Sequence, residues 1–77
     1  MSDYISDITL HFNEDTNHDQ REELRDKFLV IDGVMAADCH DEKPHLFMVA
    51  YDPELVSSRD LLSTMNNNGM HAQLLGL

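Results

Sequence analysis

The feature that most constrains the fold is a repeated switch between two periods of hydrophobicity. In residues 5–13 apolar residues fall at every second position, as in a half-buried strand: Ile8, Leu10 and Phe12. In residues 17–31 apolar residues recur at intervals of four and three, as on one face of a helix: Leu24, Phe28 and Ile31. The first part of the chain therefore predicts a strand followed by a helix.

The remainder predicts two more strands, a second helix and a last strand. Residues 34–40 and 46–51 have strand character, and the polar, proline-containing segment 41–44 between them predicts a hairpin loop. Ser57 is a good helix cap, with Asp60 at the spacing of a capping box. The apolar face of this second helix is formed by Leu61, Leu62 and Met65. Residues 72–75 predict the final strand.

The glycines and the order of elements together predict one small α+β domain. Gly33 and Gly69 follow the two helical segments, where a left-handed turn commonly ends a helix. Strand, helix, strand, strand, helix, strand is the split βαβ pattern. We therefore expect residues 1–77 to form one ferredoxin-like βαββαβ sandwich, a four-stranded antiparallel sheet with two helices on one face.

The charge of the chain limits the classes of partner. Fifteen acidic residues stand against five Lys and Arg, a formal net charge of −10. Nucleic acid and anionic membrane surfaces would be repelled, and no apolar run is long enough for membrane insertion. A basic protein surface or a cation fits the sign better. Cys39 is the only cysteine, and Met1 to Tyr4 carries no basic stretch, so the default expectation is a reduced protein in the cytoplasm.

Several short motifs resemble a known family. They are Asp32-Gly33-Val34, Tyr51-Asp52-Pro53, Val56-Ser57 with Asp60-Leu61, and Gly69. In this order and spacing, over about residues 5 to 75, the chain resembles the heavy-metal-associated domain. That domain is the fold of small copper chaperones and of the N-terminal modules of metal-transporting ATPases.

The resemblance places a metal loop, Gly-Met-Thr-Cys-x-x-Cys, between the first strand and the first helix. Counted back from Gly33, the two cysteines fall on Asn17 and Gln20, and only Thr16 of the motif remains. Copper(I) prefers thiolate sulfur, and neutral amides bind it poorly. We therefore predict that these positions hold no metal, that the domain needs no cofactor, and that it serves as a protein-interaction module.

The loop also admits a second interpretation. Asp15, Asn17 and Asp19 have the spacing that opens a calcium loop, and Asp26 stands where its last ligand would be. The sixth position, however, is Gln20 and not glycine, and the following residues have a helical period. The competing interpretation is that these polar residues cap the helix N-terminus.

The five histidines keep a metal-binding alternative open. His11 and His71 are predicted on the sheet face away from the helices, on neighbouring strands, where they could hold zinc, nickel or copper(II). They lack an evident third ligand, and they can equally be polar residues of a solvated face.

His18 lies in the altered loop, as a surface residue or a contact site. His40 and His45 flank the hairpin loop and are expected to be exposed. The alternative function is a metal-binding or metal-delivery protein that uses His and acidic residues.

A partner surface is predicted on the open face of the sheet. The side chains expected to form an apolar strip there are Leu46, Met48, Ala36, Ala50 and Leu75. The candidate partner-binding residues are Asn17 and Gln20 in the loop and Met48 and Leu46 on the sheet. The expected partner is an unidentified protein, basic in charge, or a second copy in a homodimer.

The chain is not predicted to be an enzyme. No Ser-His-Asp order, paired-carboxylate motif or glycine-rich phosphate loop is present. Cys39 is expected to point inward, where a lone thiol behaves as a small hydrophobic residue.

Overall fold

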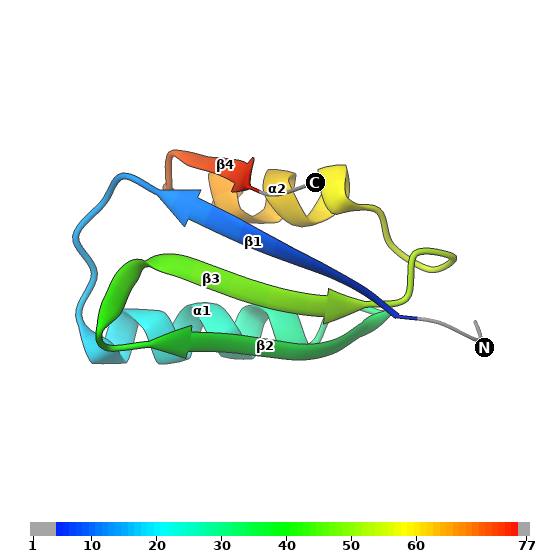
Figure 1. The fold of residues 1–77 in the computed structure, drawn as a ribbon, viewed down its shortest axis with the longest axis horizontal. Coiled ribbons are helices and arrows are strands. Elements are labelled where there is room, and N and C mark those ends of the chain that lie inside the picture. The colour runs from blue at the N-terminus through cyan, green and yellow to red at the C-terminus, as the bar shows by residue number, and fades with distance from the viewer. Residues whose placement is uncertain (1–4, 76–77) are drawn as a thin grey trace.

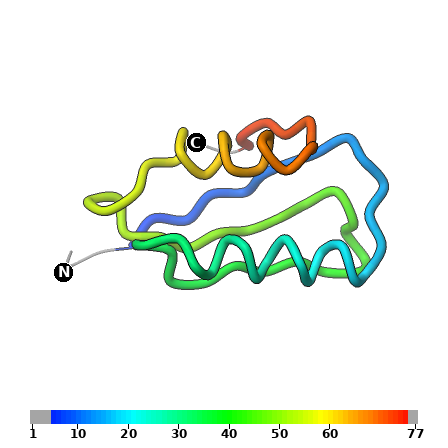
Figure 2. The backbone as a smooth tube through the Cα atoms, turned by 180° about the vertical axis from the view of Figure 1, so that it is seen from behind, coloured from blue at the N-terminus to red at the C-terminus, as the bar shows by residue number. Residues whose placement is uncertain are grey.

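The computed structural model describes residues 5–75 and has the predicted order of elements. They are β1 (Ser6–Phe12), α1 (His18–Leu29), β2 (Val34–His40), β3 (Lys43–Tyr51), α2 (Ser58–Asn67) and β4 (Ala72–Leu75). The strands form one sheet in the order β2-β3-β1-β4, and every neighbouring pair is antiparallel. Figure 1 shows the sheet with both helices behind it, and Figure 2 shows the helix layer from the other side. The ferredoxin-like sandwich predicted from the sequence is confirmed.

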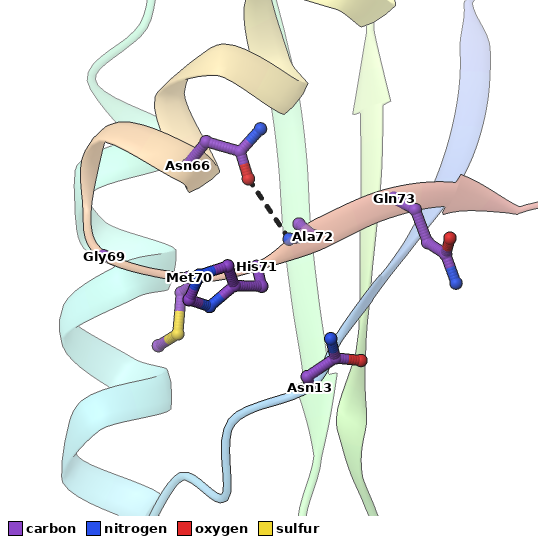
Figure 3. Close-up of a pocket in the computed structure, with 7 residues that line it drawn as sticks. All are labelled: Asn13, Asn66, Gly69, Met70, His71, Ala72 and Gln73. Carbon is purple, nitrogen blue, oxygen red and sulfur yellow. Dashed lines mark hydrogen bonds between the residues drawn. The ribbon is translucent and has the colours of Figure 1, made fainter.

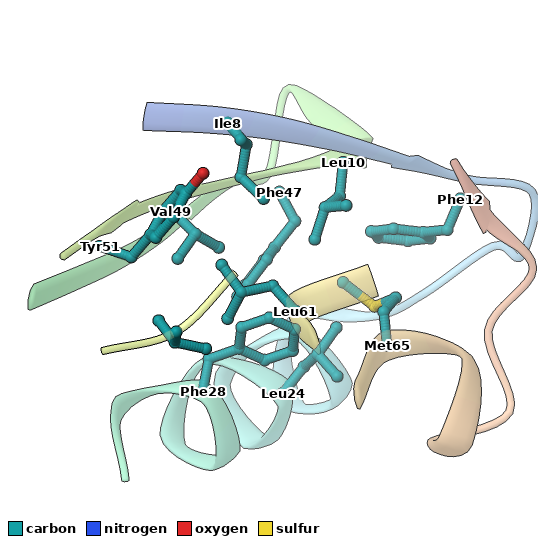
Figure 4. Close-up of a cluster of buried hydrophobic side chains, with 11 residues drawn as sticks. Ile8, Leu10, Phe12, Leu24, Phe28, Phe47, Val49, Tyr51, Leu61 and Met65 are labelled. Atoms are coloured by element: carbon teal, nitrogen blue, oxygen red, sulfur yellow. The ribbon is translucent and has the colours of Figure 1, made fainter. Parts of the chain in front are cut away.

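The core lies between the helices and one face of the sheet. Alternate residues of β1 and β3 point into it, so that Leu10 and Phe47 face each other across the two central strands. The Phe28 ring of α1 meets the Phe47 ring edge to face, with centroids 4.9 Å apart (Figure 4). Leu61 and Met65 bring α2 onto the same cluster, and both are fully buried. Cys39 points inward from β2 and packs against the edge of this core, as predicted.

Each helix begins at a capping box. At α1 the Gln20 amide donates to the Asn17 side chain, and the Asn17 amide donates to the Gln20 side chain. At α2 the amides and side chains of Ser57 and Asp60 make the same exchange. The two boxes satisfy backbone donors that a helix N-terminus otherwise leaves unpaired.

Gly33 is required by both its backbone and its surroundings. Its φ of +98° lies in the left-handed region, which disfavours residues that carry a Cβ. A Cβ at this position would also lie 2.7 Å from the Cβ of Leu55. The Gly33 carbonyl accepts a hydrogen bond from the Asp52 amide at 2.7 Å, which holds the end of β3 against the α1–β2 turn.

Two predicted boundaries are wrong. The first helix ends at Leu29 rather than at residue 31, because the Ile31 amide bonds to the Phe28 carbonyl in a tighter final turn; Ile31 still packs against the core. Pro44 lies within β3 and not in the hairpin loop. The strand tolerates it because pairing with β1 begins only at Leu46, so the missing N–H of Pro44 breaks no bond of that ladder.

Candidate functional site

The β1–α1 loop lies at the end of the sheet where the β2–β3 hairpin turns, at the left of Figure 1. Asn17 and Gln20, the positions at which the family resemblance expects thiolates, are both exposed. Asn17 Oδ1 accepts from the Gln20 amide at 2.8 Å, and Gln20 Oε1 accepts from the Asn17 amide at 2.9 Å. The two side-chain oxygens are therefore engaged in helix capping.

Arg21 occupies the interior of this loop. It is 5% exposed, and its Nη1 donates to the Thr16 carbonyl at 2.5 Å and to Thr16 Oγ1 at 3.1 Å. Its Nη2 donates to Asp41 Oδ1 in the hairpin turn at 2.6 Å. The Thr16 hydroxyl in turn donates to the Pro44 carbonyl at 3.2 Å. A buried guanidinium thus joins the loop to the hairpin and places a positive charge beside the loop oxygens.

Sequence reasoning missed Arg21, although the signal was present. Arg21 precedes Leu24 by three residues and Phe28 by seven, so the helical period that marked those two residues as buried also marks Arg21. A charged residue on the core face of a predicted helix requires a partner. Asp41, twenty positions away, could not be recognised as that partner from spacing alone.

His18 extends the same network at the surface. Its Nδ1 lies 3.1 Å from Asp41 Oδ1, and its Nε2 lies 3.3 Å from Glu22 Oε1. The Asp41 hydrogen bond, followed by the charge of Glu22, raises the pKa of His18 above its usual value of 6.5. The bonds from Arg21 and then His18 lower the pKa of the Asp41 carboxyl below its usual value of 3.8.

These shifts define the pH range of the contact. The stability that the folded state gains from protonated His18 is fully present below pH 6.5 and is lost as the pH rises through the raised pKa. The stability that the folded state gains from ionised Asp41 is fully present above pH 3.8 and is lost as the pH falls through the lowered pKa. The His18–Asp41 pair therefore stabilises the fold fully only between these two values.

The contact predicts a measurable titration of His18. In an NMR pH titration, the midpoint for the His18 ring is expected above 6.5 in the parent and closer to 6.5 in Asp41→Asn, because the acceptor of its principal hydrogen bond loses its negative charge. Glu42→Gln removes the same charge from the neighbouring residue and is the matched control. An equal change in both variants would mean that only the overall charge matters, and would contradict the contact.

Glu14 ties the loop to the start of β4. Its Oε1 accepts from the His71 amide at 2.8 Å, and its Oε2 meets Nδ1 of the His71 ring. These hydrogen bonds lower the pKa of the Glu14 carboxyl. His71 is thereby used to fix β4 against the loop, with most of its ring exposed to solvent.

The predicted pairing of His11 with His71 is not what the structure shows. His11 faces Gln73 on β4, while the Asn13 amide donates to the carbonyl of His71, further along the chain. The His11 ring instead stacks on His45, with centroids 6.0 Å apart.

His45 is only partly exposed, with 36% of its side chain accessible, because its ring has neighbours on both sides. Nδ1 lies 3.0 Å from the Phe12 carbonyl, and Nε2 lies 3.2 Å from Asp15 Oδ1. His40 is exposed as expected, 3.7 Å from Asp38. Within residues 5–75, no three or more His, Cys, Asp or Glu side chains converge on a place for a metal ion.

The calcium-loop interpretation is also wrong. Asp19 and Asp26 both lie within α1, so the segment that would have to wrap around the ion is helical. Asn17 is the N-cap, and the carboxylate of Asp19 stands in the first turn, where the helix dipole favours a negative charge. The capping interpretation is confirmed.

A cavity of ≈ 520 Å³ opens where β1, α2 and β4 meet (Figure 3). Its lining residues are Asn13, Asn66, Gly69, Met70, His71, Ala72 and Gln73. Asn66 Oδ1 accepts from the Ala72 amide at 3.1 Å, so one of the amide side chains in its wall already helps to start β4. Of these lining residues, only His71 was a candidate site residue from the sequence.

The two candidate partner residues of the sheet lie on the face opposite the helices. Met48 and Leu46 are half-buried there, two residues apart on β3. Met48 is beside Ala36 and Ala50 in a shallow groove, whereas Leu75 is separated from Met48 by Thr9 of β1. Asn17 and Gln20 lie at the N-terminus of α1 and do not contribute to this groove. The apolar strip is therefore shorter than predicted.

Two further observations concern the reactivity of Cys39 and the length of the helices. Burial raises the pKa of the Cys39 thiol, which favours its unreactive protonated form. In the described part of the chain, neither helix is both long and apolar enough to cross a membrane.

Comparison with known proteins finds solved structures that have the same fold as this chain. No family model matches the sequence, and no curated protein matches it. Among solved structures, a copper-binding domain of the P-type ATPase HMA7 is 20% identical with a TM-score of 0.81, over 91% of this chain and 93% of that one. Oxidized MerP from Ralstonia metallidurans CH34 is 16% identical with a TM-score of 0.82, over 95% and 100%.

A Bacillus anthracis protein of proposed copper-ion binding is 15% identical with a TM-score of 0.81, over 94% of this chain and 100% of that one. At these identities the likeness concerns the backbone, and it agrees with the fold that the sequence motifs predicted. The chain therefore has the same ferredoxin-like fold as a copper-binding domain of a P-type ATPase.

Proposed function

We propose that this chain is a non-catalytic domain of the heavy-metal-associated type that has lost the thiolate metal site and serves as a protein-interaction module. The observation that carries the proposal is the buried guanidinium of Arg21 in the β1–α1 loop. Arg21 donates hydrogen bonds to both the carbonyl and the hydroxyl of Thr16, and the Asp41 carboxylate compensates its charge.

A metal ion in this loop would meet unfavourable electrostatics. It would lie close to the Arg21 guanidinium, and like charges repel, although Asp41 offsets part of this repulsion. The nearest side chains at the family positions are the amides of Asn17 and Gln20, whose oxygens already accept backbone hydrogen bonds. Neutral amides also match copper(I) poorly.

The interaction role is supported by the sheet face that no helix covers and by the charge of the chain. One face of the sheet carries no helix, and a groove on it is lined in part by Met48, Ala36 and Ala50. The chain has a net charge of −10, which favours a basic partner. A cytoplasmic location, with the lone Cys39 reduced, belongs to the same proposal.

The alternative function is a metal site built from histidines and carboxylates, and it can be tested separately. It would need His11, His71 or His18 to gather around one ion, and in residues 5–75 these side chains have different partners. We therefore do not favour it over the interaction module.

Native mass spectrometry with micromolar copper(I), zinc, nickel or copper(II) tests the proposal. The parent is expected to retain no ion in stoichiometric amount. A bound ion that is lost in His11→Ala or His71→Ala would establish the alternative. A copper(I) ion lost in Asn17→Ala/Gln20→Ala would overturn the proposal directly, and Asn66→Ala/Asn67→Ala is the matched control.

A further inference from the structure

We propose that the groove on the outer face of the sheet binds an extended segment of a partner protein in which two basic residues flank an apolar one. This inference rests on the proposed function, because it names the class of partner. The groove has a volume of ≈ 360 Å³ and lies over β1, β2 and β3. The residues that line its outward-facing part include Asp7, Thr9, Ala36, Asp38, Met48 and Ala50.

The strand register places two carboxylates at opposite corners of the groove. Ala50 of β3 faces Asp7 on one side and Ala36 on the other. Met48, two residues before Ala50 on the same strand, faces Thr9 and Asp38 in the same way. Asp7 and Asp38 are thus separated diagonally by two strand spacings and two residues, about 12 Å in an ordinary sheet. The apolar side chains of β3 lie between them.

Within residues 5–75, neither carboxylate is paired with a lysine or an arginine. Asp7 makes no hydrogen bond or ion pair with another residue in 5–75, and Asp38 has only His40, at 3.7 Å. The basic residues of the chain all lie in the helices or at the first position of β3: Arg21, Arg25, Lys27, Arg59 and Lys43. The groove is therefore complementary to an occupant that supplies positive charge at two points.

An extended chain can match this spacing. Its side chains alternate, so residues i, i+2 and i+4 point to the same side, and i and i+4 are about 13 Å apart. Basic residues at i and i+4 would reach Asp7 and Asp38, while an apolar residue at i+2 would lie over Met48 and Ala50. Met48 suits such a contact because its unbranched thioether adapts to different shapes.

A second copy of this chain fits the groove poorly. Two groove faces brought together would place four aspartates near one another, between molecules that each carry a net charge of −10. Like charges brought face to face without a counter-charge oppose association. The homodimer that the sequence predicted as one option is therefore disfavoured at this face, and sedimentation equilibrium can detect it.

The test is an NMR titration of the full chain with the capped peptide Ala-Arg-Ala-Leu-Ala-Arg-Ala. Amide shifts are expected to concentrate on the groove residues of β1, β2 and β3, with weaker binding by a peptide in which citrulline replaces both arginines. Asp7→Asn/Asp38→Asn is expected to weaken binding by about tenfold. Asp26→Asn/Asp32→Asn, which removes the same charge from exposed positions away from the groove, should leave the affinity within about twofold.

The possible results separate this inference from the proposed function. Shifts on the helices, an equal loss of affinity in both double variants, or no binding at millimolar peptide would each overturn the groove assignment. None of these results changes the metal measurement, which tests the loss of the thiolate site independently. Sedimentation equilibrium that shows a dimer abolished by Met48→Glu would also overturn the inference, because a second copy would then occupy the groove.

Discussion

Asn17→Cys/Gln20→Cys is expected to bind about one copper(I) ion per chain, tightly enough to compete with a copper(I) chelator that keeps the parent metal-free. The two positions lie at the N-terminus of α1, where the helix dipole favours thiolates over thiols. Two thiolates and one copper(I) carry a net negative charge, so the Arg21 guanidinium that disfavours a bare cation would stabilise this complex. Anaerobic chelator competition followed by absorbance measures the gain.

The matched control is Asn17→Ser/Gln20→Ser, which introduces side chains of similar size with oxygen in place of sulfur. It is expected to keep the helix cap and to gain no copper(I). If the cysteine variant is folded by circular dichroism and still binds no more copper(I) than the serine variant, the loop does not have the geometry that the family resemblance implies. The prediction that two thiolates are enough to make a copper(I) site here would then be wrong.

Leu61→Ala is expected to lower the free energy of unfolding by about 3–5 kcal/mol. Leu61 is fully buried, and it fixes α2 against the core formed by both helices and the sheet. A chain of 77 residues is typically stable by about 4–12 kcal/mol, so this one change removes a large share of the total. Urea denaturation should show a lower midpoint with little change in slope.

Leu55→Ala makes the same chemical change at a residue that is 60% exposed. It is expected to cost less than about 0.5 kcal/mol, because little apolar surface is lost from the interior. A similar cost for both variants would mean that α2 is not packed as the structure shows, and would undermine the fold on which the other proposals depend.

The fold could be read from the sequence because its determinants are local. Alternation in β1 and β3 decided which residues face the helices, and Leu10, Phe47 and Val49 are buried as the pattern required. The cap of α2 at Ser57 and the turn glycine Gly33 were also visible as short motifs. Where prediction failed locally, at Pro44 and at the end of α1, the outcome depended on where pairing with β1 begins and on the geometry of one turn.

The site was only partly visible because its contacts join distant parts of the chain. The sequence showed that Asn17 and Gln20 occupy the positions where the family resemblance expects cysteine, and it also indicated a capping role for the loop. The bond from Glu14 to His71 spans 57 positions, and the stacking of His11 on His45 rather than its pairing with His71 depends on the register of three strands. No periodic pattern specifies such pairs.

By itself, the sequence determined the order of elements, the buried face of each one and the absence of cysteine from the β1–α1 loop, because periodicity and residue chemistry act within a few neighbours. Only the tertiary structure decided that Arg21 fills that loop and that Asp7 and Asp38 share a groove with Met48. The reason is physical: the partner of a buried charge, and the side chains that share a sheet face, are fixed by how strands and helices dock. Residues far apart in the chain then come within a few ångströms of one another.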